Sequence, residues 1–143
     1  MKILGIDHIG IAPKNAKESV QFFDSILRLP SGGQETVEEQ KTMTTIFHSS
    51  CQTEQTSSRL EILEPMPNQE GPIDAFINKK GGGIHHLALR VECLDSAIQE
   101  LIEKGIKMID HTPRTGVHQT RIAFIHPHST GGILVELVEA ASS

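Results

Sequence analysis

Residues 5–11, GIDHIGI, occur a second time as residues 83–89, GIHHLAL, 78 positions further along the chain. Both copies keep the glycine, the isoleucine after it, a histidine at the fourth place and an alternation of aliphatic residues. A second pair of matching segments, Leu60–Glu64 (LEILE) and Val135–Glu139 (VELVE), lies 75 positions apart. Such self-similarity at both ends of each half indicates a duplicated structural unit.

Each half of the chain has the same order of expected elements. Residues 15–28 and 95–104 carry apolar side chains at helical spacing, which predicts one amphipathic helix in each half. Asn15 and Glu18 form a capping-box pair at the start of the first helix, and Gly105 ends the second. Short β-type runs follow both helices, so each half is predicted to be βαβββ. In the first half these runs are residues 42–48 and 60–63, and a strand with a weaker pattern is expected before them. In the second half they are residues 107–110, 121–125 and 133–138.

The repeat predicts a single domain of the α+β class that consists of two tandem βαβββ modules. Module one takes about residues 1–65, module two takes about residues 83–140, and a linker of about residues 66–82 holds a short helix that starts at Pro72. The 143 residues are the length of one domain. A module of about 70 residues alone would have only a marginal core, which is why the modules are expected to share one domain.

The composition argues against several classes of protein. Thirteen Lys and Arg against 18 Asp and Glu give a net charge of -5, and the five Phe are accompanied by no Tyr or Trp. Nucleic-acid binders need basic patches and stacking aromatics, so that class is disfavoured. The apolar stretch at the N-terminus is too short for a membrane span, and two cysteines outside a CxxC spacing fit a reducing compartment. We expect a cytoplasmic protein that binds neither nucleic acid nor membranes.

Strand parity separates the histidines that belong together. Side chains alternate between the two faces of a strand, so His8 shares a face with the small residues Gly10 and Ala12. His86 occupies the same place in the second copy, whereas His85 points with the leucines. A lone histidine in an apolar strand is more often a hydrogen-bonded core residue, so a metal site would need a second kind of ligand at equivalent positions.

The repeat supplies that second residue, because Glu61 and Glu136 lie among aliphatic neighbours in the matching terminal strands. Either glutamate alone could belong to a solvated edge strand, but a buried and unpaired carboxylate costs several kcal/mol. One histidine and one glutamate per repeat predict a four-ligand site for a divalent ion such as Zn, Co, Mn, Ni or Fe. The predicted ligands are His8, Glu61, His86 and Glu136. Two coordination positions then remain open on a six-coordinate ion, as in catalytic sites.

These segments resemble the vicinal oxygen chelate superfamily of glyoxalases, extradiol dioxygenases and bleomycin resistance proteins, and within it the methylmalonyl-CoA epimerases. The likeness is carried by residues 6–12, 60–65, 81–91 and 122–137. It implies a glyoxalase-like domain with the metal site in the cavity of a curved sheet, and the family ligands fall on the same four positions. The implied function is a metal-dependent isomerase that moves a proton next to a thioester carbonyl, as in the epimerisation of methylmalonyl-CoA. The resemblance makes Glu136 the candidate base.

The chain departs from the family pattern in the loops near the substrate. His118 and Gln119 stand where the family usually has two glycines, and His128 stands where it usually has lysine. Some members carry a second glutamate, proposed as a base, on the strand of residues 42–47, where Thr44 is the equivalent here. The group on the opposite face of the substrate therefore stays open, with His118 and Glu61 as candidates.

Two further expectations concern partners. An acyl-CoA substrate needs cations for its phosphates, and basic residues are concentrated in the second half, namely Lys79, Lys80, Lys104, Lys107, Arg114 and Arg121. A homodimer is expected, with Ile9, Ile11 or the helix at residues 72–80 as apolar contact surface. Two alternative functions use the same fold: a glyoxalase-type lactoylglutathione lyase, and a non-catalytic small-molecule binder of the resistance type.

Overall fold

The computed structural model describes residues 1–49 and 58–140, which group into two compact units. The first unit contains residues 8–85, and the second contains residues 1–7 together with residues from 86 onward. The division falls inside two strands, immediately before His8 and immediately before His86.

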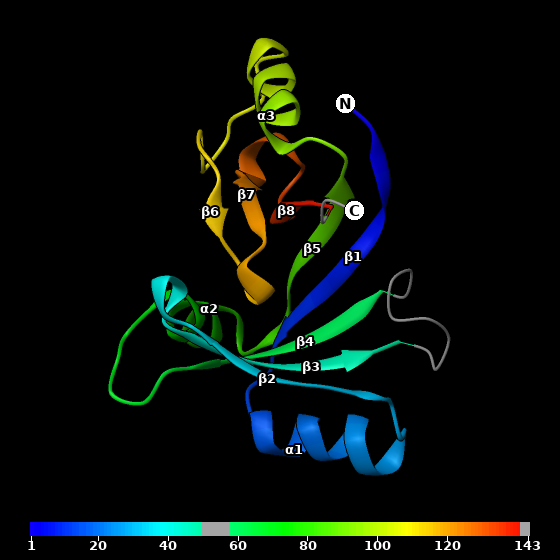
Figure 1. The fold of residues 1–143 in the computed structure, drawn as a ribbon. Coiled ribbons are helices and arrows are strands. Elements are labelled where there is room, and N and C mark those ends of the chain that lie inside the picture. The colour runs from blue at the N-terminus through cyan, green and yellow to red at the C-terminus, as the bar shows by residue number, and fades with distance from the viewer. Residues whose placement is uncertain (50–57, 141–143) are drawn as a thin grey trace. The chain divides into compact units, whose positions relative to one another are not determined.

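The strands of the first unit are hydrogen-bonded in the order β2-β3-β4-β1 (Figure 1). β1 runs parallel to β4, whereas β3 is antiparallel to both of its neighbours. The elements in chain order are β1 (Ile3–Ala12), α1 (Ala16–Gln21), η1 (Phe22–Ile26), β2 (Ser31–Val37), η2 (Glu38–Gln40), β3 (Thr42–His48), β4 (Arg59–Pro65) and α2 (Pro72–Lys80).

The second unit repeats this pattern with the order β1-β5-β8-β7-β6, where β1 contributes its first residues. β5 runs parallel to β8, and β7 is antiparallel to both β8 and β6. The remaining elements are β5 (Gly83–Val91), α3 (Leu94–Glu103), β6 (Arg114–Thr115), η3 (Val117–Gln119), β7 (Arg121–Ile125), η4 (Pro127–Ser129) and β8 (Val135–Glu139). The same parallel and antiparallel pairings in both units confirm the predicted βαβββ repeat and the α+β class.

The core of the second unit lies between α3 and one face of its strands. Leu94, Ala97 and Ile98 of the helix are buried, as the helical spacing predicts, and they pack against side chains of β7 and β8. The buried members of this cluster are Val91, Leu94, Ala97, Ile98, Met108, Ala123, Ile125 and Leu137. The opposite face of the same strands is thereby left to other side chains, including His86 and Glu136.

The first predicted helix is built differently from the prediction of a continuous α-helix over residues 15–28. Asn15 does cap it, because its side chain accepts a hydrogen bond from the Glu18 backbone N–H at 3.0 Å. After Gln21 the chain widens into a π-helical turn, in which the Leu27 N–H donates to the Phe22 carbonyl five residues earlier. A π turn shifts the angular position of every residue that follows it.

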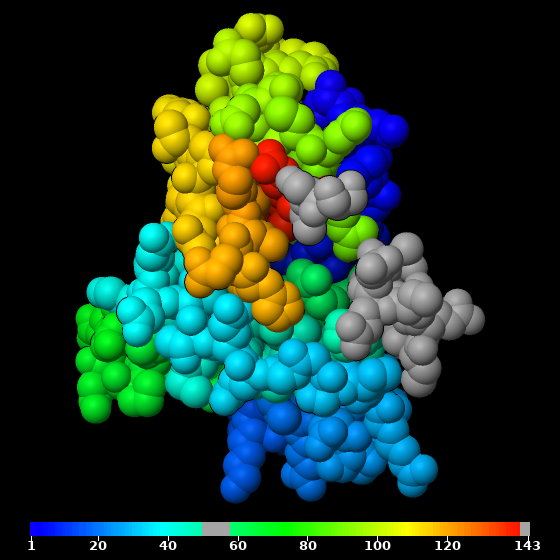
Figure 2. Space-filling model, viewed as in Figure 1, coloured from blue at the N-terminus to red at the C-terminus, as the bar shows by residue number. Residues whose placement is uncertain are grey.

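The predicted apolar stripe of this helix is consequently not buried. Ile26 is 66% exposed and Leu27 is 50% exposed, and neither α1 nor η1 contains a buried residue. Phe23 is half-buried and makes an aromatic contact with Phe47, at 6.0 Å between ring centroids. Residues 16–26 form part of the surface on the face seen in Figure 2, where they are blue. An open hollow of about 900 Å³ runs along this segment within the first unit.

The prediction of a strand at residues 107–110 is also wrong. Only a single bridge forms there, between Met108 and Ile125, and the strand that pairs with β7 at its other end is β6. Asp110 is the physical reason, because its carboxylate accepts the Phe124 backbone N–H at 2.9 Å in place of a ladder carbonyl. The other predicted strands agree with the structure to within two residues at each end. In the part of the chain that is described, each helix is too short or too polar to cross a membrane.

Candidate metal centre and active site

The first unit contains a buried histidine–glutamate pair. His8 Nδ1 lies 3.3 Å from Glu61 Oε2, and the two side chains are 4% and 2% exposed. In the parallel register, Gly10 is opposite Glu61, so His8 is the diagonal neighbour of Glu61 on the same face of the sheet.

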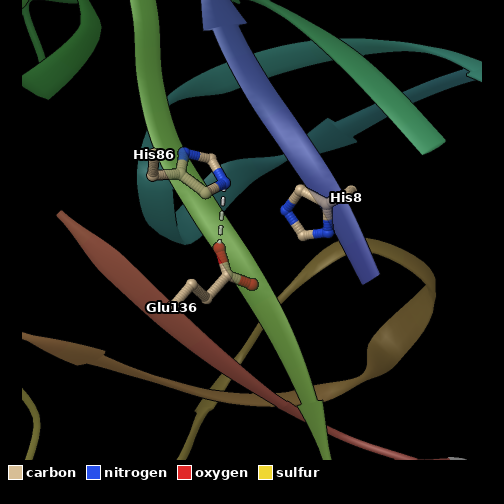
Figure 3. A group of neighbouring side chains, drawn as sticks. All are labelled: His8, His86 and Glu136. Carbon is tan, nitrogen blue, oxygen red and sulfur yellow. Dashed lines mark ion pairs between the residues drawn. The ribbon is translucent and has the colours of Figure 1, made fainter. Parts of the chain in front are cut away.

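The second unit contains the equivalent pair. His86 Nε2 lies 3.0 Å from Glu136 Oε2, and both side chains are 6% exposed. Ala88 is opposite Glu136 in the register of β5 and β8, so His86 is diagonal to Glu136 as His8 is to Glu61. Figure 3 shows the His86 ring on β5 facing the Glu136 carboxylate, with the ion pair dashed, and also labels His8.

A cluster of apolar side chains lies next to the histidine–glutamate pair of the second unit. Phe124 lies opposite Glu136 on β7, and its ring packs edge-on against His86 with 5.7 Å between centroids. The other members of this cluster are small or aliphatic. The whole cluster consists of Ala88, Ile122, Phe124, Val138 and the partly buried Leu134. Such surroundings exclude water, so they strengthen electrostatic interactions within the pair.

His85 is separated from the candidate ligands by its strand parity, as predicted. Its ring packs edge-on against Phe76 at 4.8 Å between centroids. Phe76 belongs to α2, the linker helix predicted to start at Pro72, which ends at Gly81 in the left-handed conformation with φ of 80°. The adjacent histidines His85 and His86 therefore have different surroundings.

Two partly buried arginines lie near the candidate ligands, and neither was predicted from the sequence as a site residue. Arg59 Nη2 lies 3.5 Å from Glu61 Oε2. Arg90 Nη2 lies 3.1 Å from Asp7 Oδ1, and Asp7 is only 4% exposed. Parity carried a signal for Arg59, since it precedes Glu61 by two residues and therefore shares its face. The separation of 83 positions between Asp7 and Arg90 left no local signal for their pairing.

The loops that depart from the family pattern also have defined conformations. His118 and Gln119 both have φ of 58°, in the left-handed region that glycine occupies with the least strain. The turn is closed by a hydrogen bond from the Gly116 N–H to the Thr120 carbonyl at 2.9 Å. Thr44, on β3, is 1% exposed and supplies a hydroxyl where some family members have a carboxylate.

Two of the basic residues expected to contact the phosphates of coenzyme A, Arg121 and Arg114, have defined contacts in the second unit. Arg121 donates to the carboxylates of Asp95 and Glu139, and these hydrogen bonds, Asp95 first, raise the pKa of its guanidinium. Glu139 also accepts the Leu94 N–H at the start of α3 at 2.8 Å, so Arg121 belongs to a structural clamp rather than to a ligand site. Arg114 lies over the Phe124 ring, with 6.0 Å from Cζ to the centroid, and its Nη1 also lies 3.4 Å from Asp110 Oδ1.

The donor set fits a divalent ion. Each unit presents one imidazole and one carboxylate that are almost fully buried, and these residues are among the described side chains suited to hold a metal ion. Nitrogen and oxygen donors of this kind bind zinc and other first-row divalent metals. The donor chemistry in both units therefore supports a metal centre rather than ordinary core packing.

Comparison with known proteins gives the class. The chain belongs to the glyoxalase/bleomycin resistance protein/dioxygenase superfamily, whose family model matches residues 7–124. Members of this superfamily use divalent metals, in keeping with the donor set above.

Individual relatives indicate a particular group within this superfamily. The uncharacterized protein YqjC of Bacillus subtilis is 40% identical over 134 residues, which cover 94% of this chain and 91% of that protein. The mitochondrial methylmalonyl-CoA epimerase of Dictyostelium discoideum is 32% identical over 136 residues, 94% of this chain and 77% of that protein. A variant of the Streptomyces coelicolor methylmalonyl-CoA epimerase, solved in complex with 2-nitronate-propionyl-CoA, has a TM-score of 0.89 and 29% identity, covering 99% and 97% of the two chains. The protein is thus an enzyme similar to the methylmalonyl-CoA epimerases.

Proposed function

We propose that this protein is a divalent-metal-dependent epimerase that inverts the carbon next to the thioester carbonyl of methylmalonyl-CoA. The observation that carries the proposal is the pair of buried histidine–glutamate contacts, at equivalent positions of two repeated strand pairs. The likeness to epimerases over nearly the whole chain supports the same reaction type, and a relative that was solved with an acyl-CoA ligand supports a CoA thioester as substrate.

In this proposal the metal ligands are His8, Glu61, His86 and Glu136, and the ion is cobalt, zinc, manganese or nickel. When bound, the ion supplies a Lewis acid that stabilises negative charge on the thioester carbonyl oxygen. Burial of all four side chains keeps water away from them, which favours the interaction between the charged groups.

Glu136 has the additional role of base. Its carboxylate accepts the proton from the carbon next to the carbonyl, and the electron pair of the broken C–H bond moves toward the carbonyl oxygen to give the enolate. A proton then returns to the opposite face of that carbon from a second donor, which inverts the centre. Glu136 gives its proton to solvent, and the second donor takes one from solvent, so the starting state is restored. His118 and Glu61 are the candidates for the second donor. The contact of Glu136 with His86 and its place opposite Phe124 hold the carboxylate in one position during the transfer.

The test is solvent deuterium exchange into methylmalonyl-CoA by the metal-loaded protein. Glu136→Gln keeps the shape of the side chain and removes its basicity, so the exchange rate is expected to fall by about 100-fold or more, the scale of general-base loss. Glu64→Gln removes a carboxylate from the equivalent stretch of the first half, and it is expected to leave the rate unchanged. A Glu136→Gln protein that holds metal and exchanges at the wild-type rate would contradict the mechanism.

The exchange assay, together with an isomerisation assay on the methylglyoxal–glutathione adduct, distinguishes the proposed function from the two alternative functions. Metal-loaded wild-type protein that exchanges no thioester but isomerises the methylglyoxal–glutathione adduct would be a glyoxalase-type lyase. Protein that does neither would be a binding protein of the resistance type.

We also propose a homodimer in the cytoplasm. β1 exposes apolar side chains in the second unit, with Ile3, Leu4 and Ile6 each more than 40% exposed. Contiguous exposed apolar side chains are typical of association surfaces. Cys93 is a free, exposed thiol, which fits a reducing compartment. Light scattering at 15.7 kDa, the mass of one chain, would rule out the dimer.

A further inference from the structure

One carboxylate oxygen of Glu61 lies close to two nitrogen-bearing side chains of the first unit. Its Oε2 atom is 3.3 Å from His8 Nδ1 and 3.5 Å from Arg59 Nη2. The side chain of Arg59 is only 17% exposed, and that of Glu61 is 2% exposed. A guanidinium stays protonated in proteins, so the buried Glu61 carboxylate has a permanent positive charge beside it.

The repeat shows that the fold does not require an arginine at this place. Leu134 precedes Glu136 by two residues, as Arg59 precedes Glu61, and it packs against the apolar cluster of the second unit. A guanidinium that is largely buried carries a desolvation cost that leucine avoids. An arginine in the first unit is therefore explained by its charge rather than by its bulk.

A cation beside a metal ligand has two opposite effects on metal binding. It orients the carboxylate, which strengthens binding, and it repels the metal ion and competes for the same oxygen, which weakens binding. Orientation contributes little here, because His8 already contacts Glu61 Oε2 and because 3.5 Å is longer than the charge-assisted hydrogen bond of about 2.7–2.9 Å. Charge repulsion falls off slowly with distance, so it is the larger effect at this separation.

We propose that Arg59 is a built-in counter-charge for Glu61, which stabilises the fold before a metal ion binds and weakens the binding of that ion. This inference rests on the proposed function only in that Glu61 is a metal ligand, and it concerns residues of the first unit alone. Because Arg59 neutralises the buried carboxylate, the fold does not depend on metal for that purpose. When an ion binds Glu61, its repulsion of the guanidinium offsets the attraction between Arg59 and Glu61. The stability that Arg59 contributes without metal therefore reappears as a loss of metal affinity.

Arg59→Leu, which installs the residue of the other repeat, tests the proposal by two measurements that are expected to change in opposite directions. Competition with a chromophoric chelator should show that the variant binds cobalt about 10- to 100-fold more tightly than wild-type protein. This range lies between the effects of one unit charge at such a distance in water and near a protein surface. Urea unfolding in EDTA should show that the variant is less stable than wild-type protein, because Glu61 has lost its cationic partner.

Two further variants at the same position separate charge from shape. Arg59→Gln removes the charge but keeps hydrogen-bonding groups, and it carries the same two expectations if the leucine variant does not fold. Arg59→Lys keeps the charge, so its cobalt affinity is expected to match that of wild-type protein.

Arg90→Leu is the matched control. The side chain of Arg90 is 20% exposed and pairs at 3.1 Å with Asp7, which is not among the proposed ligands. This variant is expected to lose stability without gaining cobalt affinity, because the charge of Arg90 is balanced by Asp7.

The outcomes distinguish this inference from the proposed function. An Arg59→Leu protein that binds cobalt as wild-type protein does, or more weakly, would overturn the inference and leave the proposed function standing. An unchanged urea midpoint in EDTA would also overturn it, and so would an equal gain in cobalt affinity in Arg90→Leu, since net charge alone would then explain the effect. Wild-type protein that binds no cobalt would overturn the metal centre of the proposed function itself.

Discussion

Replacing His86 by alanine is expected to abolish stabilisation by metal, whereas the same change at His85 leaves it intact. His86 is 3.0 Å from Glu136, and both side chains are 6% exposed. His85 is the next residue back along the strand, but its ring packs against Phe76 of α2. The two substitutions remove the same number of atoms, so they are matched in chemistry and differ only in the direction of the side chain.

The expected magnitudes follow from these contacts. Without metal, His86→Ala loses the edge-on contact with Phe124, worth about 0.5–1.5 kcal/mol. It also removes a partner from the buried Glu136 carboxylate, at about 1–3 kcal/mol. The free energy of unfolding should therefore fall by about 1.5–4.5 kcal/mol, the sum of the two contributions. His85→Ala loses only its aromatic contact, about 0.5–1.5 kcal/mol.

The effect of metal on thermal stability is expected to differ between the two variants. An ion that binds only the folded state at 100 times its dissociation constant stabilises by about 2.7 kcal/mol, which raises the melting temperature by roughly 6–10 °C for a chain of this size. Thermal unfolding with cobalt and with EDTA should show this rise in wild-type and His85→Ala protein and show none in His86→Ala. An equal loss of the cobalt effect in both variants would refute the parity argument.

Two further predictions concern stability. Glu139→Ala removes the acceptor of the Leu94 N–H at the start of α3, and urea unfolding should show a loss of about 1–2 kcal/mol, the value of a helix cap plus a partly exposed ion pair; an unchanged urea midpoint would contradict the clamp. Gly82→Ala would place Cβ 2.6 Å from the backbone nitrogen of Lys14, so it should destabilise far more than Gly81→Ala, whose Cβ meets open space at a similar positive φ. Equal unfolding midpoints for the two alanine variants would refute the close approach.

The repeat and its chemistry could be predicted from the sequence because they depend on local periodicity. Alternation along a strand is a property of the backbone, so the sides taken by His85 and His86 follow from their order alone. The helix at residues 94–103 also follows from local spacing, because its apolar residues occur once per turn. Glu61 and Glu136 were identified because each occupies the same place in a duplicated motif.

Other features were decided by individual hydrogen bonds that the spacing of apolar residues does not indicate. Asp110 takes the N–H of Phe124, so a β-type run of residues pairs through a single bridge only. The stripe that includes Ile26 and Leu27 has helical spacing, but the π turn changes its direction and leaves both residues exposed.

The ion pairs of Arg90 and Arg59 also could not be predicted from the sequence. Asp7 meets Arg90 only because β1 and β5 are neighbours in the sheet. Arg59 has an obvious face from its parity, but its closeness to Glu61 and its burial depend on how the strands β1, β3 and β4 pair. Side-chain direction along one strand is set by covalent geometry, whereas burial and ion pairing depend on which strands meet, and that is an outcome of packing the whole chain.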